Sequence, residues 1–142
     1  MGAGSDGGLM SWADAILHSN ANRRAIVVTH SLLNPAPWPA PAEWTKEGPA
    51  IFTALAGNPN LFLMLCGHRP GEGRRHEAAG DGSRHVDVVL ADYQSSTNGG
   101  NGFLRLLEFS PNRNQIRVKT YSPWTGRWAT NSAAMFTLDW PQ

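Results

Sequence analysis

Two short apolar runs organise the first half of the chain. Ile26 to Thr29 is β-branched and Leu61 to Cys66 is apolar throughout, so both have the length and composition of strands. Each run is apolar on both faces, which is typical of central parallel strands that are covered on both sides. Helices are predicted before them, over Ser11 to Asn20 and over Ile51 to Ala56. This alternation of helix and strand predicts a parallel pairing of the two strands.

The second half of the chain has a different pattern, in which apolar and polar residues alternate between turns. Strands are predicted at Val86–Tyr93, Phe103–Phe109, Gln115–Tyr121 and Met135–Trp140, with loops at Arg69–Arg84 and Trp124–Asn131. Strands of this length joined by short turns favour an antiparallel meander. The whole pattern predicts an α/β protein, with a mixed β-sheet and flanking helices.

Length and composition limit the class of protein. A chain of 142 residues is the size of one domain, and 41% hydrophobic with 16% charged residues is enough for a packed core. We predict a flexible N-terminal lead over residues 1–10 and a single α/β domain over residues 11–142. The formal net charge of +1 gives no electrostatic reason to expect nucleic acid or an anionic membrane as a partner.

Cysteine content and hydropathy narrow the picture further. The single cysteine, Cys66, excludes an intramolecular disulfide and a multi-cysteine zinc site, and its apolar strand favours a buried thiol. No stretch approaches the ~18 apolar residues of a membrane span, and the N-terminus lacks the pattern of a signal peptide. We therefore predict no membrane partner and a cytoplasmic location.

Two histidines stand where the apolar strands end. His30 follows the first strand and His68 the second, and the carboxyl ends of parallel strands meet at the edge where α/β proteins bind ligands. We therefore expect the two side chains to lie close together. Imidazole is a common metal ligand, although a site needs three or more ligands. The alternative is two hydrogen-bonded strand ends without a metal.

Arginines are concentrated just after His68. The basic residues of this segment that could grip a phosphate are Arg69, Arg74, Arg75, His76, Arg84 and His85. Arginine presents a fork of donors that suits bidentate contact with phosphate, so Arg69, Arg74 and Arg75 are the predicted substrate contacts. The alternative is a solvated loop.

A serine hydrolase is a further alternative. Ser31 adjoins His30, and Ser83 lies near His85 in the sequence. The chain has no G-x-S-x-G nucleophile elbow, so this alternative would be a metal-independent ester hydrolase built on a loop serine with His30 or His76.

Three segments carry a family resemblance: AIVVTH (25–30), LFLMLCGH (61–68) and DYQSSTNGGNGFLRLLEFSPNRNQIRVKTY (92–121). With them, the chain from Ser11 to Trp140 resembles the C-terminal half of the calcineurin-like metallophosphoesterases. The resemblance implies half of a four-layer αββα sandwich. It also implies metal-dependent hydrolysis of a small phosphomonoester or phosphodiester, in which a nearby histidine protonates the leaving oxygen.

The resemblance also implies a ligand set, which this chain matches only in part. His30 and His68 match two late histidine ligands of one divalent transition metal (Mn, Fe or Zn), and they are the predicted catalytic residues. The second histidine of the family's G-H-x-H pair is replaced by Pro70, which has no ligating side chain. The early D-x-H, G-D-x-x-D and G-N-H-D/E motifs are absent. We therefore expect a truncated or degenerate member, with its metal content reduced to one ion or lost.

The missing half has a consequence for assembly. An isolated half would expose apolar sheet surface, which usually marks an interface. We therefore predict a homo-oligomer, most simply a two-fold dimer. Two alternatives remain. A separate chain could complete the site, or the protein could be a non-catalytic remnant that assembles through its exposed sheet.

Overall fold

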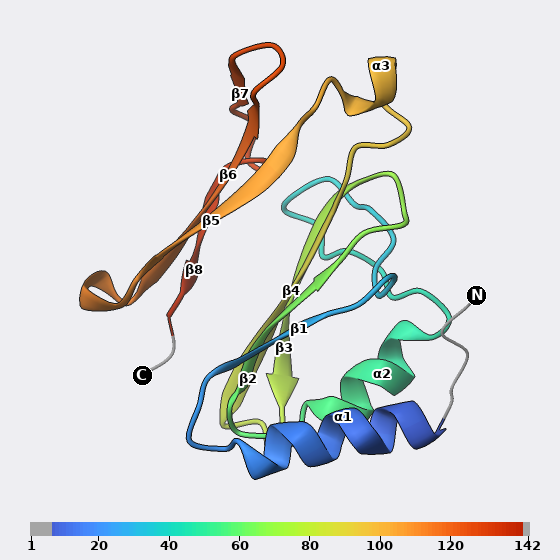
Figure 1. The fold of residues 1–142 in the computed structure, drawn as a ribbon, viewed down its shortest axis with the longest axis vertical. Helices are drawn as coiled ribbons and strands as arrows, with labels where there is room; N and C mark the ends of the chain where they lie inside the picture. Colours follow the sequence, from blue (N-terminus) through green and yellow to red (C-terminus); the bar gives the residue numbers. More distant parts are fainter. Residues whose placement is uncertain (1–6, 141–142) are drawn as a thin grey trace.

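The computed structural model describes residues 7–140, which form two stacked β-sheets with helices packed on one side (Figure 1). In chain order the elements are α1 (Gly7–Ser19), β1 (Ala25–Val28), α2 (Gly48–Leu55), β2 (Leu61–Cys66), β3 (Gly71–Ala79), β4 (Arg84–Asp92), α3 (Thr97–Gly100), β5 (Leu104–Ser110), the 3₁₀ turn η1 (Pro111–Arg113), β6 (Gln115–Ser122), β7 (Arg127–Ala129) and β8 (Phe136–Asp139). No helix in this described range is long and apolar enough to cross a membrane.

The first sheet is mixed and has the strand order β1-β2-β4-β3. β2 pairs in parallel with β1 on one side and with β4 on the other, while β3 runs antiparallel to β4. The predicted α/β class, with a mixed sheet and flanking helices, is confirmed. The parallel pairing of the two apolar runs is also confirmed, with Val27 opposite Met64.

The first sheet is covered by different layers on its two faces. On one face, Leu17 of α1 and Leu55 of α2 belong to the same buried cluster as Met64 of β2. On the other face, Leu63 shares a second cluster with Val118 of the second sheet. Residues 7–140 therefore form three layers, a helical one and two sheets, and no helical layer outside the second sheet. Correspondence to half of a four-layer sandwich stays a prediction.

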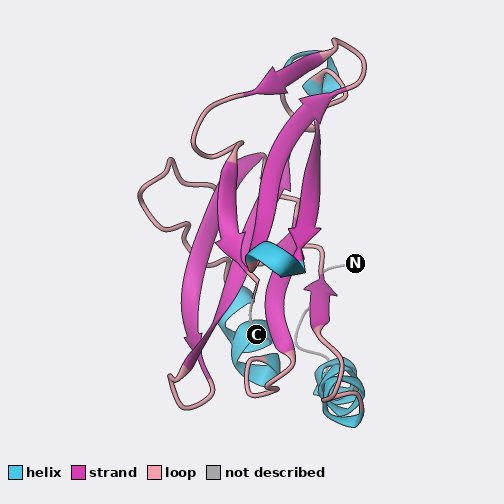
Figure 2. Cartoon of the chain, turned by 90° about the vertical axis from the view of Figure 1, so that its left-hand side faces the viewer, coloured by secondary structure: helices cyan, strands magenta, loops and turns pink. Residues whose placement is uncertain are grey.

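β1 is an edge strand, which corrects the prediction that both apolar runs are central. Ile26 is 40% exposed and Val28 is 74% exposed, whereas β2 lies inside the sheet and is almost entirely buried. β5 forms one edge of the second sheet, and Leu104 and Leu106 on it are also exposed. Figure 2 shows both edge strands, β1 and β5, on the same side of the stacked sheets, to the right in that view.

The segment Arg69–Arg84 is not a long loop as predicted, because residues 71–79 of it form β3. The loop before α2 lies along this strand, where Ala36 N–H donates to Glu72 O (3.2 Å) and Ala42 N–H donates to Arg74 O (3.0 Å). Glycine is required for this approach, because a Cβ at Gly73 would lie 2.8 Å from Ala42 Cβ. The outer edge of β3 is therefore covered by the loop, whereas no strand within residues 7–140 pairs with the outer edge of β1.

The second sheet is antiparallel, as predicted for the second half of the chain, but the predicted meander is wrong at its first strand. Val86–Tyr93 corresponds to β4, which lies in the first sheet and pairs in parallel with β2. β5, β7 and β8 all pair with β6 in antiparallel orientation. The predicted loop Trp124–Asn131 contains the short strand β7. At the N-terminus, α1 begins at Gly7, so residues 7–10 of the predicted flexible lead are helical, and residues 1–6 lie outside the described part of the chain.

Candidate functional site

His30 and His68 lie side by side at the edge where the parallel strands end, as predicted. Each stands two residues beyond its strand, His30 after β1 and His68 after β2. Their ring centroids are 4.3 Å apart and the rings are inclined at 42°. Both residues are exposed, so the pair is open to ligands.

The backbone that presents the pair is held in a tight turn. His68 has a φ of 66°, and Arg69 N–H donates to Gly67 O at 2.8 Å, which closes a γ-turn around His68. Gly67 N–H in turn donates to His30 O at 3.2 Å and ties the two segments together. A γ-turn with a positive φ at a non-glycine residue is strained, and such strain is concentrated at functional sites.

A third parallel strand brings Gln94 to the same edge. β4 ends at Asp92, and the Asp92 carboxylate accepts a hydrogen bond from Gln94 N–H at 2.9 Å. The Gln94 amide Nε2 donates to His68 O at 3.4 Å. Gln94 is not among the site residues predicted from the sequence. It could have been predicted from a parallel pairing of β4 with β2, which places the carboxyl end of β4 beside His68.

The donors at this edge amount to part of a metal site. Within residues 7–140, no group of three or more His, Cys, Asp or Glu side chains is placed to hold a metal ion. Cys66 is buried on the helical face, and burial raises the pKa of its thiol, so the thiol favours its neutral form there. Two imidazoles fit as neutral nitrogen ligands of a divalent transition metal, but the remaining ligands would have to come from other residues.

The predicted arginine cluster is divided among three places. Arg69 is exposed and directly follows His68, so it lies at the site. Arg75 is ion-paired with Glu77 at 2.5 Å and donates to Ala42 O at 2.5 Å. Arg74 lies between the aromatic rings of Trp38 and Phe136.

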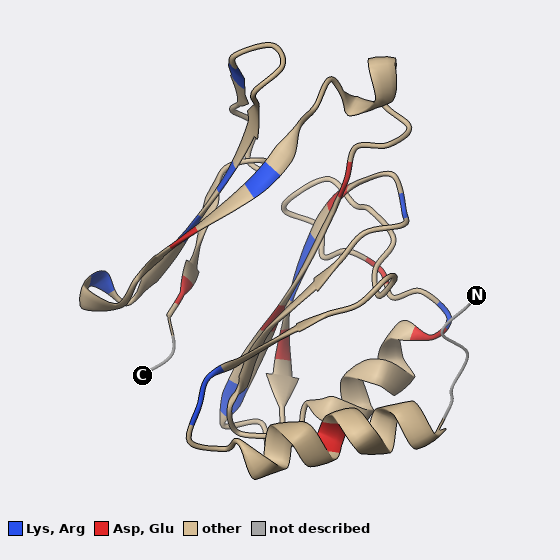
Figure 3. Cartoon of the chain, in the orientation of Figure 1, with Lys and Arg blue, Asp and Glu red and all other residues tan. Residues whose placement is uncertain are grey.

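The rest of the predicted cluster lies away from the His30–His68 pair. Arg84 donates to the backbone carbonyls of Ala56 and Leu61, at the opposite ends of the strands. His76 and His85 stack on each other with ring centroids 4.3 Å apart. Figure 3 shows basic and acidic residues scattered through both sheets rather than gathered on one face.

The serine alternative gains no support from the described contacts. No hydrogen bond joins the hydroxyl of Ser31 or Ser83 to a histidine within residues 7–140, and Ser83 N–H donates to Asp81 at 2.9 Å.

The sequence was compared with family models and with known proteins. No family model matches the chain. The chain is similar to the uncharacterized protein YvnB of Bacillus subtilis (strain 168), with 34% identity over an alignment of 121 residues that covers 81% of this chain. The chain spans only 9% of the length of YvnB, so the similar region is a small part of that protein.

Proposed function

We propose that this chain contributes to the metal centre of a calcineurin-like metallophosphoesterase, with His30 and His68 as ligands of one divalent transition metal. The observation that carries the proposal is the pairing of the two rings, 4.3 Å apart, at the carboxyl ends of parallel strands. The resemblance in segments 25–30, 61–68 and 92–121 supplies the type of site. The substrate would be a small phosphomonoester or phosphodiester.

The chain's own residues would orient the ligands and contact the substrate. The bond between Gly67 N–H and His30 O fixes the relative position of the two segments, and Gln94 holds the carbonyl of His68. Arg69 is free to approach an anionic phosphoester beside the pair. When bound, a metal of this class acts as a Lewis acid and lowers the pKa of coordinated water.

The remaining ligands would come from outside the described residues. The free edges of β1 and β5, on the same side of the molecule (Figure 2), offer a place where further strands could extend both sheets. In the family that this chain resembles, the other half of the sandwich would occupy that place. The exposed apolar side chains Ile26 and Val28 support an interface there.

Metal content and inhibition by chelator test this function directly. Protein purified without a histidine tag should contain at least one transition metal ion per chain or per dimer, as measured by mass spectrometry. Any hydrolysis of bis(p-nitrophenyl) phosphate should stop after chelation and return when Mn²⁺ is added. A metal-free protein whose ester hydrolysis, on p-nitrophenyl acetate for example, resists chelator would overturn the proposal in favour of a metal-independent esterase.

A second candidate, a non-catalytic protein that assembles with itself, is favoured by the same exposed side. Leu9, Trp12 and Ile16 of α1 are also exposed beside β1 and extend the apolar surface. If a second copy covers this surface, sedimentation at micromolar concentration should give a dimer, and Val28→Lys should make it a monomer. A matched substitution on the other edge of the second sheet, Thr137→Lys, should leave the dimer intact. A monomeric wild-type protein would contradict self-assembly but would leave the metal proposal to its own test.

A further inference from the structure

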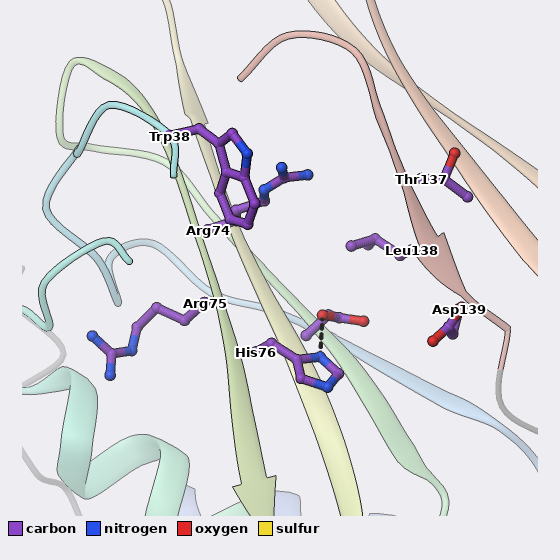
Figure 4. Close-up of a pocket in the computed structure, with 8 residues that line it drawn as sticks. Trp38, Arg74, Arg75, His76, Thr137, Leu138 and Asp139 are labelled. Carbon is purple, nitrogen blue, oxygen red and sulfur yellow. Dashed lines mark hydrogen bonds and ion pairs between the residues drawn. The ribbon is translucent and has the colours of Figure 1, made fainter. Parts of the chain in front are cut away.

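A second polar site lies between the two sheets, on the side opposite the free edges. It is a groove of about 240 Å³ lined by β3, β4 and β8 together with Trp38 from the loop along β3. Figure 4 shows the charged side chains that enter it, with Arg74 beneath Trp38 and with Asp139 approaching from β8. Its volume is below the ~300–1,000 Å³ of sites for drug-sized ligands, so a small ligand fits best.

Arg74 is held in place by two aromatic rings and forms no ion pair with the described residues. Its guanidinium carbon lies 3.5 Å from the ring centroid of Trp38 and 4.1 Å from that of Phe136. Its Nε is buried and has no hydrogen-bond partner, and Arg74 takes part in none of the ion pairs formed by the described residues. The charge of Asp87 reaches Arg74, but no carboxylate of the described residues lies within ion-pair distance of it. A guanidinium that is fixed by stacking and forms no ion pair is preorganised for bidentate contact with an oxyanion.

Two carboxylates face the same groove. Asp87 is mostly buried, with 14% of its side chain exposed, and its Oδ1 pairs with His76 Nδ1 at 2.9 Å. Asp139 lines the groove from β8 (Figure 4), and its charge acts on Asp87. Burial raises the pKa of Asp87 most, and His76 lowers it by its hydrogen bond and its charge. The charge of Asp139 raises this pKa again, and the charge of Arg74 lowers it least. A cation placed between the two acids would relieve this repulsion.

We propose that this groove binds a small zwitterion of the α-amino acid class, with its carboxylate on Arg74 and its ammonium group between Asp87 and Asp139. The proposal does not depend on the metal function, because none of these residues belongs to the edge with His30 and His68. A simple anion is disfavoured because Asp87 and Asp139 would repel it. A metal ion alone is disfavoured because the described residues bring no three metal-binding side chains together.

The test compares three probes that carry different parts of the charge pattern. L-alanine has both charges, acetate has only the carboxylate, and ethylammonium has only the cation. Titrations of the whole chain, followed through the indole N–H signals of tryptophan by NMR, should show L-alanine binding at least ~10-fold more tightly than either single-charge probe. Because this comparison uses the wild-type protein, it does not depend on whether any variant folds.

Variants then assign the two ends of the ligand. Arg74→Lys keeps the charge but loses the bidentate fork, and it should weaken L-alanine binding by about 10-fold or more. Asp139→Asn should weaken L-alanine binding without weakening the binding of acetate. Arg113→Lys, in the exposed turn η1, is the matched control and should leave both unchanged. Circular dichroism confirms that each variant is folded.

Three results would overturn the proposal. Acetate binding as tightly as L-alanine would mean a plain anion site. Ethylammonium binding as tightly as L-alanine would mean a cation site that does not use Arg74. No shift with any probe up to about 50 mM would mean that the groove binds no such ligand, since a site of this charge density should exceed millimolar affinity.

Discussion

The protein contains two histidine pairs with the same spacing and different surroundings. The rings of His30 and His68 and the rings of His76 and His85 are both 4.3 Å apart, but the first pair is tilted by 42° and the second is stacked at 11°. The first pair follows parallel strands at their carboxyl ends. The second pair lies on neighbouring antiparallel strands within the sheet, where Ala78 of β3 is opposite His85 of β4.

The two pairs differ in the contacts that their ring nitrogens make. Nδ1 of His76 is bound to the buried Asp87, so one ring nitrogen of that pair is already used. No ring nitrogen of His30 or His68 takes part in the hydrogen bonds or ion pairs of the described residues, and His68 is presented by a strained γ-turn. Close approach of two rings is therefore not enough to define a metal site. The pair at the edge is distinguished by its shaped backbone and because no carboxylate of the described residues is bound to either ring.

The largest expected difference is in metal affinity. His30→Ala and His68→Ala should each weaken Zn²⁺ or Mn²⁺ binding by more than about 100-fold, because even residues that only support a ligand contribute ~10–100-fold. The matched control is His85→Ala, which removes a ring from a pair of the same spacing and should change affinity less than about twofold. Isothermal titration calorimetry on untagged protein makes the measurement. Equal losses in His85→Ala and His68→Ala would show that the two pairs do not differ in this way.

A smaller effect is expected on stability, from the backbone at His68. A side chain at a φ of 66° is strained, so His68→Gly should be more stable than His68→Ala by about 1 kcal/mol in urea denaturation. The order should reverse at His30, which does not have a positive φ, because glycine there only adds freedom to the unfolded chain. If alanine and glycine at position 68 are equally stable, the turn is not strained and the contrast between the two pairs weakens.

The sequence predicted the edge with His30 and His68 correctly, because strand length follows from the local hydrophobic pattern and the alternation of helix and strand favours parallel pairing. They could not reveal that β1 is an edge strand. Ile26 and Val28 have the same apolar character as the interior residues of β2, and the difference lies in whether a neighbour is present. An apolar strand at the edge of a sheet and one in its interior can therefore have the same sequence pattern.

The groove with Arg74 could not be predicted from the sequence for a related reason. The glycines and charged residues of segment 69–84 are typical of a loop, and the strand β3 depends on pairing with β4 and on the loop that packs against Gly73. Once β3 is a strand, Arg74 and Arg75 must point to opposite faces. A cluster that is continuous in sequence is therefore divided in space, and Arg74 joins Asp87 and Asp139 instead of His68.

The smallest effect is expected on the pH dependence of stability, from Asp87, which is bound to His76 of the second histidine pair. Its raised pKa means that the folded state holds a proton more tightly than the unfolded state, so the free energy of unfolding should rise as pH falls from the raised value toward the ordinary carboxyl pKa of about 4. Asp87→Asn should remove this rise and, at neutral pH, increase stability by less than about 1 kcal/mol. Urea denaturation between neutral pH and about pH 4 measures both effects.

Glu108 provides the control of opposite sign. Lys119, by its hydrogen bond and its charge, lowers the pKa of Glu108, so the stability from this carboxylate is present above the ordinary pKa and is lost as pH falls. Glu108→Gln should therefore remove a fall in the free energy of unfolding toward low pH, whereas Asp87→Asn should remove a rise. If Asp87→Asn changes the slope in the same direction as Glu108→Gln, the ion pair with His76 outweighs burial at Asp87. The second pair would then be held by a charged carboxylate, and the groove would keep its negative charge without any ligand.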